Sequence, residues 1–111
     1  MNSNINNLSN SLVPTKDNAG TSIPSQSKAV SSSSVALIAT PLNNATDMVA
    51  WTVMDAGIYV TFDGTAASSS NGHLIASGTS GEWSKATAAA ALAIRDDATD
   101  ARVQFSEFQT R

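Results

Sequence analysis

The sequence predicts an all-β protein: a small antiparallel β-sandwich, or a jelly-roll-like variant of one, with an extended N-terminal arm. From residue 35 onward, short apolar or alternating segments are separated by turn signals at intervals of about 8–12 residues, as in sandwiches and jelly rolls. The 111 residues suffice for one domain. Because there is no cysteine, a disulfide framework, a thiol nucleophile and a thiolate metal site are excluded.

The composition changes near Ser34, and we place the boundary there, between an arm, 1–34, and a domain, 35–111. The arm is rich in asparagine and serine, and Pro14 and Pro24 interrupt any strand or helix that begins in it. Such a segment buries too little apolar surface to offset its loss of conformational entropy, so we expect it to be extended. The residues expected to bind neighbouring subunits are Ile5, Leu8, Leu12, Val13 and Ile23.

The chain carries little charge. Only 14% of its residues are charged, with a net charge of -3, whereas soluble domains average about 25%. This deficit indicates either that part of the surface does not face bulk water or that serine, threonine and asparagine solubilise it in place of charges. The acidic balance argues against nucleic acid as a partner, and no apolar run approaches the ~20 residues of a membrane-spanning helix. Residues 1–10 lack the cationic start of a secretory signal, so we expect synthesis and folding in a cytoplasm.

The first strands of the domain follow from apolar runs and alternation. Residues 35–40 form a short apolar run that Pro41 stops. In 48–55 the residues at odd positions are the better core face, and they are Val49, Trp51 and Val53. In 58–62 Ile58, Val60 and Phe62 share one side, and Asp63-Gly64 then ends the strand with a turn that favours positive φ.

The second half of the domain is less regular. Residues 73–76 and 82–84 are weaker strand candidates, separated by Gly78 and Gly81. The alanine-rich stretch 87–94 favours a short helical turn over 87–91 and then a strand over 92–95, which we expect to pair with the last strand through the loop 96–100. That last strand, 101–108, places Val103, Phe105 and Glu107 on one face.

No catalytic, cofactor-binding or metal-binding set is predicted. His73 is the only histidine; a structural role near a loop is favoured over a general base, because no positioned constellation surrounds it in the sequence. Asp96, Asp97 and Asp100 lack the ligand spacing of a calcium loop, which favours a solvated turn. Trp51 is expected in the core. For Trp83, core and interface stay open, because interfaces favour tryptophan.

A longer segment, 58–76, reads IYVTFDGTAASSSNGHLIA. It resembles a pattern in small virion proteins of tailed bacteriophages, in which a strand ends in Phe/Trp-Asp-Gly-Thr, a loop rich in small residues follows, and Gly-His-x-Leu or Gly-His-x-Ile begins the next strand. The matching residues include Asp63, Gly64, Gly72 and His73, here as structural turn residues. Looser similarity covers about 35–108. Where relatives often have Pro-Thr after Asp-Gly-Thr, this chain has Ala66-Ala67.

The resemblance implies a compact β domain in a virion. We therefore expect a non-enzymatic structural protein, foremost a capsid decoration (cement) protein that forms homo-oligomers and straps its arm onto the major capsid protein or another virion protein. A head-to-tail connector, or a ring component associated with the tail or a fibre, is the first alternative. A carbohydrate-binding surface module that uses Trp83 and Tyr59 is the second. No cofactor is expected.

Overall fold

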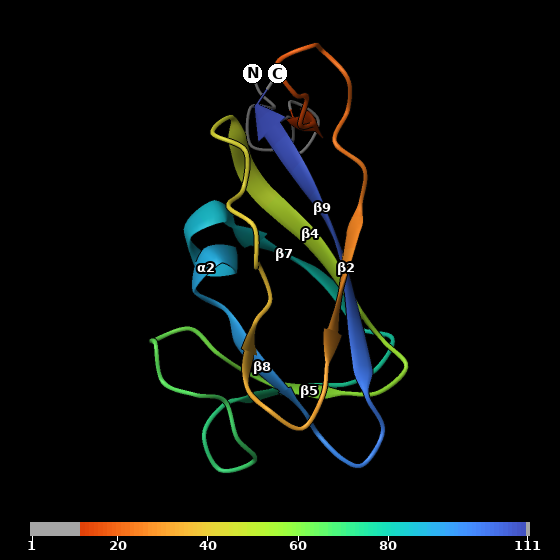
Figure 1. Cartoon of the computed structure of the whole chain (residues 1–111), viewed down its shortest axis with the longest axis vertical. Coiled ribbons are helices and arrows are strands. Elements are labelled where there is room, and N and C mark those ends of the chain that lie inside the picture. Colours follow the sequence, from red (N-terminus) through yellow and green to blue (C-terminus); the bar gives the residue numbers. More distant parts are fainter. Residues whose placement is uncertain (1–11, 111) are drawn as a thin grey trace, which may run out of the picture.

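The computed structural model describes residues 12–110, which form two antiparallel β-sheets packed on each other as a small all-β sandwich (Figure 1). The first sheet has the order β1-β9-β4-β7, and β2 pairs with β9 on the same side as β1. Its strands are β1 (Leu12–Pro14), β2 (Gln26–Val30), β4 (Thr46–Met54), β7 (Ser80–Ser84) and β9 (Ala101–Thr110). The all-β prediction is confirmed.

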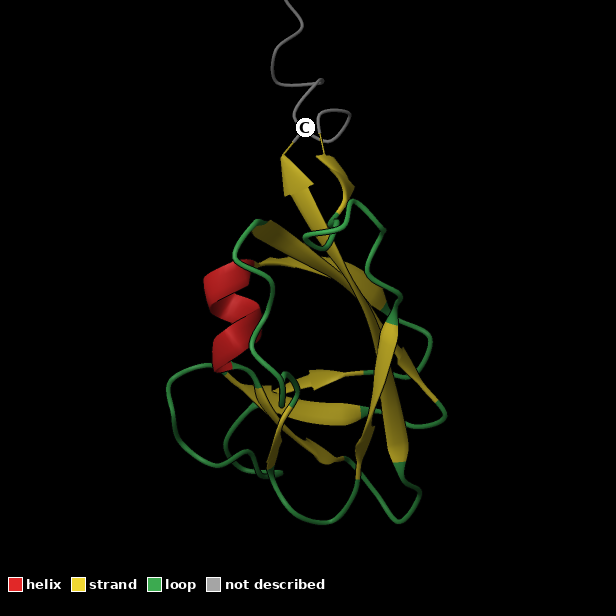
Figure 2. Cartoon of the chain, turned by 45° about the horizontal axis from the view of Figure 1, so that its top comes forward, coloured by secondary structure: helices red, strands yellow, loops and turns green. Residues whose placement is uncertain are grey.

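The second sheet is smaller and has the order β3-β8-β5-β6. Its strands are β3 (Val35–Ala36), β5 (Ile58–Thr61), β6 (His73–Ile75) and β8 (Leu92–Arg95). In Figure 1 the long strands β4 and β9 follow the long axis of the molecule, whereas β5 runs across it. The short helix α2 (Lys85–Ala90) closes one side between the sheets (Figure 2).

Alternation along the strands builds the core. Val49, Trp51 and Val53 of β4 are buried on the predicted face, and the register places Trp51 opposite Phe105 and Val53 opposite Val103. The second sheet contributes Ile58, Val60 and Ala93 to the same cluster. The predicted core faces of 48–55, 58–62 and 101–108 are therefore confirmed.

Helix α2 replaces the helical turn predicted at 87–91 and begins earlier. Ser84 caps it, because its Oγ accepts a hydrogen bond from the N–H of Thr87 at 3.2 Å. Ala88 is fully buried, and Ala91, directly after the helix, is also in the core. The small side chains of the alanine run let the backbone of this segment approach the sheets closely.

One prediction about a strand partner and one about the length of a strand are wrong. The strand at 92–95 exists, but β8 pairs with β5 and β3 of the second sheet, not with β9. Residues 96–100 therefore connect the two sheets rather than closing a hairpin. Of the predicted strand at 35–40, only Val35–Ala36 pairs; Leu37 turns its side chain into the core instead.

The boundary at Ser34 is also wrong for the residues that the structure describes. β1 and β2 extend the first sheet along β9, and Val30 is fully buried. Residues 12–30 contain few apolar side chains, but their strands form because β9 supplies hydrogen-bonding partners for their backbone. The section between β1 and β2 is a tight loop in which Ile23 donates its N–H to the carbonyl of Thr15 at 2.8 Å.

A buried polar network joins this N-terminal section to the sheet. Glu107 is 6% exposed on the inner face of β9. Its Oε1 accepts hydrogen bonds from the hydroxyl of Thr46 at 2.7 Å and from the N–H of Asn43 at 2.9 Å. Thr15, itself buried, bonds the Thr46 hydroxyl at 3.0 Å. The network satisfies a carboxylate that would otherwise be costly to bury.

Candidate functional site

The first candidate is the turn between β5 and β6, which contains the predicted turn residues Asp63, Gly64 and Gly72. Asp63 accepts two hydrogen bonds at Oδ1 from Thr65, from the hydroxyl at 2.6 Å and from the N–H at 3.1 Å. These bonds hold the pKa of Asp63 below its ordinary value of 3.8, the hydroxyl acting more strongly than the N–H. Gly64 follows with φ of +87°, as the Asp-Gly pair predicts.

The rest of the turn bonds to itself. Thr61 donates its hydroxyl to the carbonyl of Thr65 at 2.6 Å. Asn71 donates its side-chain amide to the Thr65 hydroxyl at 2.9 Å and to the carbonyl of Ala66 at 3.2 Å. Backbone bonds between Ser68 and Asn71 close the tip in both directions. The donors and acceptors of this segment are thus used to fix its own shape.

Gly72 and His73 complete the turn. A Cβ on Gly72 would stand 3.2 Å from the carbonyl oxygen of Val60 and 3.3 Å from the Cβ of Tyr59, and φ there is +152°. Only glycine fits this approach of the turn to β5. The ring of His73 is exposed and lies 6.4 Å, between centroids, from the ring of Phe62.

An open depression of about 440 Å³ lies beside this turn. Its lining combines hydroxyl, amide and carboxylate groups with one aromatic ring and the imidazole, and consists of Thr61, Phe62, Asp63, Ser70, Asn71, Gly72 and His73. Asp63, Gly72 and His73 of the predicted set line this depression, and Gly64 follows Asp63 in the same turn.

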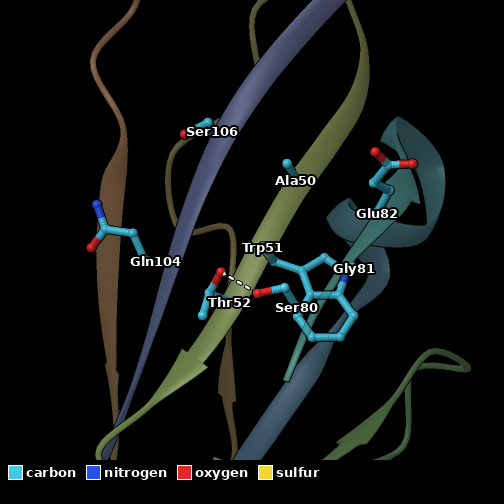
Figure 3. Close-up of a pocket in the computed structure, with 8 residues that line it drawn as sticks. All are labelled: Ala50, Trp51, Thr52, Ser80, Gly81, Glu82, Gln104 and Ser106. Carbon is cyan, nitrogen blue, oxygen red and sulfur yellow. Dashed lines mark hydrogen bonds between the residues drawn. The ribbon is translucent and has the colours of Figure 1, made fainter. Parts of the chain in front are cut away.

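A second depression, of about 450 Å³, lies on the outer face of the first sheet (Figure 3). It is lined by small or polar side chains of three strands, namely Ala50, Thr52, Ser80, Glu82, Gln104 and Ser106, with Trp51 and Gly81 beneath. The hydroxyls of Thr52 and Ser80 bond each other at 2.8 Å. The face offers hydrogen-bonding groups and a single carboxylate, that of Glu82.

Trp83 serves the interior of the domain. It is half-buried, packs against the core cluster, and stacks on Trp51 with ring centroids 4.7 Å apart. The rings of Phe62 and Trp83 form a T-shaped pair with centroids 5.4 Å apart. The register places Trp83 opposite the buried Val49, on the inner face of β7, so the interior alternative accounts for its position.

Tyr59 lies elsewhere. It alternates with the buried Ile58 and Val60, so its side chain is on the outer face of the second sheet. Trp83 and Tyr59 therefore do not converge on one surface, and the aromatic pair of the carbohydrate-binding alternative is not formed.

The residues predicted to bind a partner through the arm have separate outcomes. Leu12 and Val13 are in β1 and pair with Thr110 and Gln109 of the same chain. Ile23 is half-buried in the loop that follows. Leu12, Val13 and Ile23 therefore belong to the domain, and the prediction that they lie in a free arm is wrong. Ile5 and Leu8 lie outside the described residues.

The charged side chains of residues 12–110 form no cluster of three or more potential metal ligands. Asp100, one of the three aspartates considered for calcium, pairs instead with Arg95. No helix of this part of the chain has both the length and the apolar character needed to cross a membrane.

The sequence interpretation missed two features. Alternation places Glu107 on the inner face of the last strand but predicts no partner for it; a lone charge at a core position of an alternating strand is the available signal. The second feature is Leu74, which is 59% exposed. Its neighbours on the outer face of the second sheet depend on strand register, which the sequence does not show.

Comparison with models of protein families, with curated proteins and with solved structures finds no match to this chain.

Proposed function

We propose that this chain is a non-enzymatic structural protein of a bacteriophage virion, and that it decorates the capsid as a cement protein. The proposal is carried by the ordered residues Phe62-Asp63-Gly64-Thr65 and Gly72-His73-Leu74-Ile75 in segment 58–76, which resemble the pattern expected of small virion proteins. In this chain the segment forms one unit, β5, a self-bonded turn and β6, at the edge of a small all-β sandwich.

A rigid turn on a small β-sandwich suits a protein that presents a fixed surface to neighbours. The side chains of Asp63 and Asn71 are engaged in shaping the turn, and His73 lies beside Phe62. The low charge of the chain adds support, because an interface that buries few charges avoids their desolvation cost.

The strap of this proposal is shorter than residues 1–34. Because β1 and β2 belong to the domain's own sheet, we assign the strap to residues 1–11, in which Ile5 and Leu8 are the apolar side chains after Met1. β1 begins at Leu12 opposite Thr110, so a strap would leave the domain beside the end of β9.

The test of the proposal begins with the particle. We expect mass spectrometry of purified virions to find on the order of hundreds of copies of this chain, as a capsid lattice requires. About six or twelve copies would favour the ring alternative, a neck or tail component, over decoration. Absence of the chain from purified particles would refute both.

The strap is tested by adding purified chain back to particles that lack it. We expect deletion of residues 1–11, or the double change Ile5→Ser and Leu8→Ser, to reduce binding at least about tenfold, because apolar anchors are lost. The matched control changes Asn4→Ser and Asn7→Ser, which alters the same segment without removing an apolar side chain. Equal binding by all variants would reject the strap. The decoration proposal would then be tested by the copy number per particle alone.

A further inference from the structure

The edges of the two sheets differ in how they are protected against pairing with another chain. An exposed edge strand offers unpaired backbone groups, and proteins block such edges with charges, proline or very short strands. Among residues 12–110, β1 contains Pro14, β2 has Lys28 at its centre, β7 has Glu82 at its centre, and β3 has two residues.

β6 is short, with three residues, but it contains no proline, aspartate, glutamate, lysine or arginine. It reads His73-Leu74-Ile75, and within the described part of the chain its one strand partner is β5. Its central side chain, Leu74, is the exposed large apolar residue of the structure, at 59%. An edge with an exposed leucine at its centre is suited to pair with another strand.

The backbone of Leu74 points toward solvent. The nitrogen and the oxygen of Val60 lie 3.3 and 3.2 Å from the place where a Cβ of Gly72 would stand, so Val60 turns its polar backbone groups toward β6. In an antiparallel pair of strands, residues whose N–H and C=O point toward the partner strand alternate with residues whose N–H and C=O point away from it. Because Val60 pairs with His73 and Tyr59 with Leu74, the N–H and C=O of Leu74 point away from β5.

The side chains beside this edge are apolar as well. Leu74 is opposite Tyr59, and Tyr59 is opposite Ile94, so the three form a row across β6, β5 and β8 on the outer face of the second sheet. None of the three belongs to the residues packed in the core. β5 and β6 contain no charged residue.

We propose that β6 pairs in antiparallel fashion with β6 of a second copy of this chain, about a two-fold axis at Leu74. The second sheets of the two copies then form one continuous eight-stranded sheet, and the two apolar rows join. This inference rests on the edge alone and does not depend on the virion proposal.

We assign a second copy of this chain as the partner of β6, because the edge of β6 is complementary to itself. About this axis Leu74 faces Leu74, and His73 faces Ile75, so no like charges meet. The same operation about the central residues of the longer edge strands would place Lys28 against Lys28 in β2, or Glu82 against Glu82 in β7. Like charges directly opposite each other destabilise strand pairs, which leaves β6 as the edge suited to two-fold pairing.

Cross-linking tests the register. Directly opposite residues that exchange both backbone hydrogen bonds have Cα atoms about 5.5 Å apart, within the range that a disulfide spans. The chain contains no cysteine, so Leu74→Cys introduces a single thiol. We expect it to form covalent dimers at least about tenfold faster than Ala29→Cys, an exposed control on β2, in a glutathione buffer. Equal rates would overturn the proposed pairing.

Solution mass tests the association itself. We expect sedimentation equilibrium to give twice the chain mass for the wild type, the chain mass for Leu74→Lys, and twice the chain mass for the control Ala29→Lys. Leu74→Thr, which keeps a residue favourable for strands, should weaken the dimer without charge repulsion. Unfolding curves verify that each variant is folded. A monomeric wild type, or a dimer that Leu74→Lys leaves intact, would overturn the proposal.

Discussion

At the scale of single residues, the glycines show two separate reasons for needing no side chain. Gly64 has φ of +87° with no atom within 4 Å of a would-be Cβ, so only its backbone conformation requires glycine. Gly81 has the opposite reason: a Cβ there would stand 2.6 Å from Cζ2 of Trp51. The indole occupies the space above β7 that a side chain would take (Figure 3).

Gly81→Ala should therefore lower the free energy of unfolding by about 1–3 kcal/mol, because the added methyl group overpacks a rigid ring. Urea unfolding followed by tryptophan fluorescence measures the change. The loss should shrink when Trp51 is also changed to Phe, since the smaller ring lacks Cζ2. Additive effects of Gly81→Ala and Trp51→Phe would contradict the contact as the cause.

Two exposed carboxylates predict how stability depends on pH. Thr110 donates its hydroxyl to Oδ2 of Asp47 at 2.6 Å and its N–H at 2.8 Å. The hydroxyl foremost, and then the N–H, hold the pKa of Asp47 below its ordinary value of 3.8. Thr65 does the same for Asp63.

Because both pKa values are lower in the folded than in the unfolded state, the stabilisation is fully present above pH 3.8 and is lost as the pH falls through the folded-state values. We expect the free energy of unfolding to decline below about pH 4, and the decline to be shallower in Asp47→Asn and Asp63→Asn. Denaturant unfolding at a series of pH values measures it. Parallel pH profiles for the wild type and both variants would contradict the assignment.

At the scale of elements, β9 organises the first sheet. One side of it pairs with β4 from Arg102 to Gln109, and the other pairs with β1 and β2. Its inner face carries the buried Glu107, whose bonds to Thr46 and Asn43 fix the approach to β4. The N-terminal section reaches the same network through Thr15.

Glu107→Ala should lower the free energy of unfolding by about 2–4 kcal/mol, because it leaves two donors near the core without their acceptor. Glu107→Gln retains an oxygen acceptor and should lose less. The matched control is Ser106→Ala on the outer face of the same strand, for which we expect a change within about 0.5 kcal/mol. Thermal and urea unfolding measure the three variants; equal losses at 106 and 107 would show that the network contributes nothing.

Local sequence predicted most of the elements. Alternation located the strand at 48–55 to within two residues of β4 and identified its core face, and Asp63-Gly64 marked the turn after β5. The alanine content of 87–94 indicated a helical segment, and the shortness of that run indicated that the helix would be short, as α2 is. These features depend on residues that are neighbours in the sequence. The strand that pairs with β8 is distant in the sequence, and the predicted pairing of 92–95 with the last strand is wrong.

At the scale of the whole molecule, the N-terminal section decides what a minimal domain is. Deleting residues 1–34 removes β1 and β2, the fully buried Val30 and the buried hydroxyl of Thr15. We expect a loss of more than about 3 kcal/mol in the free energy of unfolding, because an apolar core residue and two strand pairings are lost together. Circular dichroism and urea unfolding measure it.

The control for this truncation is deletion of residues 1–11, which removes none of the contacts within 12–110 and should leave the unfolding midpoint of that part unchanged. A stable domain after removal of 1–34 would restore the original boundary at Ser34. A midpoint that falls equally in both truncations would place the stabilising contacts in 1–11 instead.

The sequence by itself determined the all-β class, the inner and outer faces of the main strands, and the chemistry of the turn, because each depends on residues within a few positions of one another. The tertiary structure alone decided which strands pair. β2 has one buried side chain, Val30, and its apolar content could not identify it as a strand. Its stability comes from backbone hydrogen bonds to β9, more than 70 residues away in the chain. Backbone groups are the same in every residue but proline, so such a partnership leaves no mark in side-chain composition.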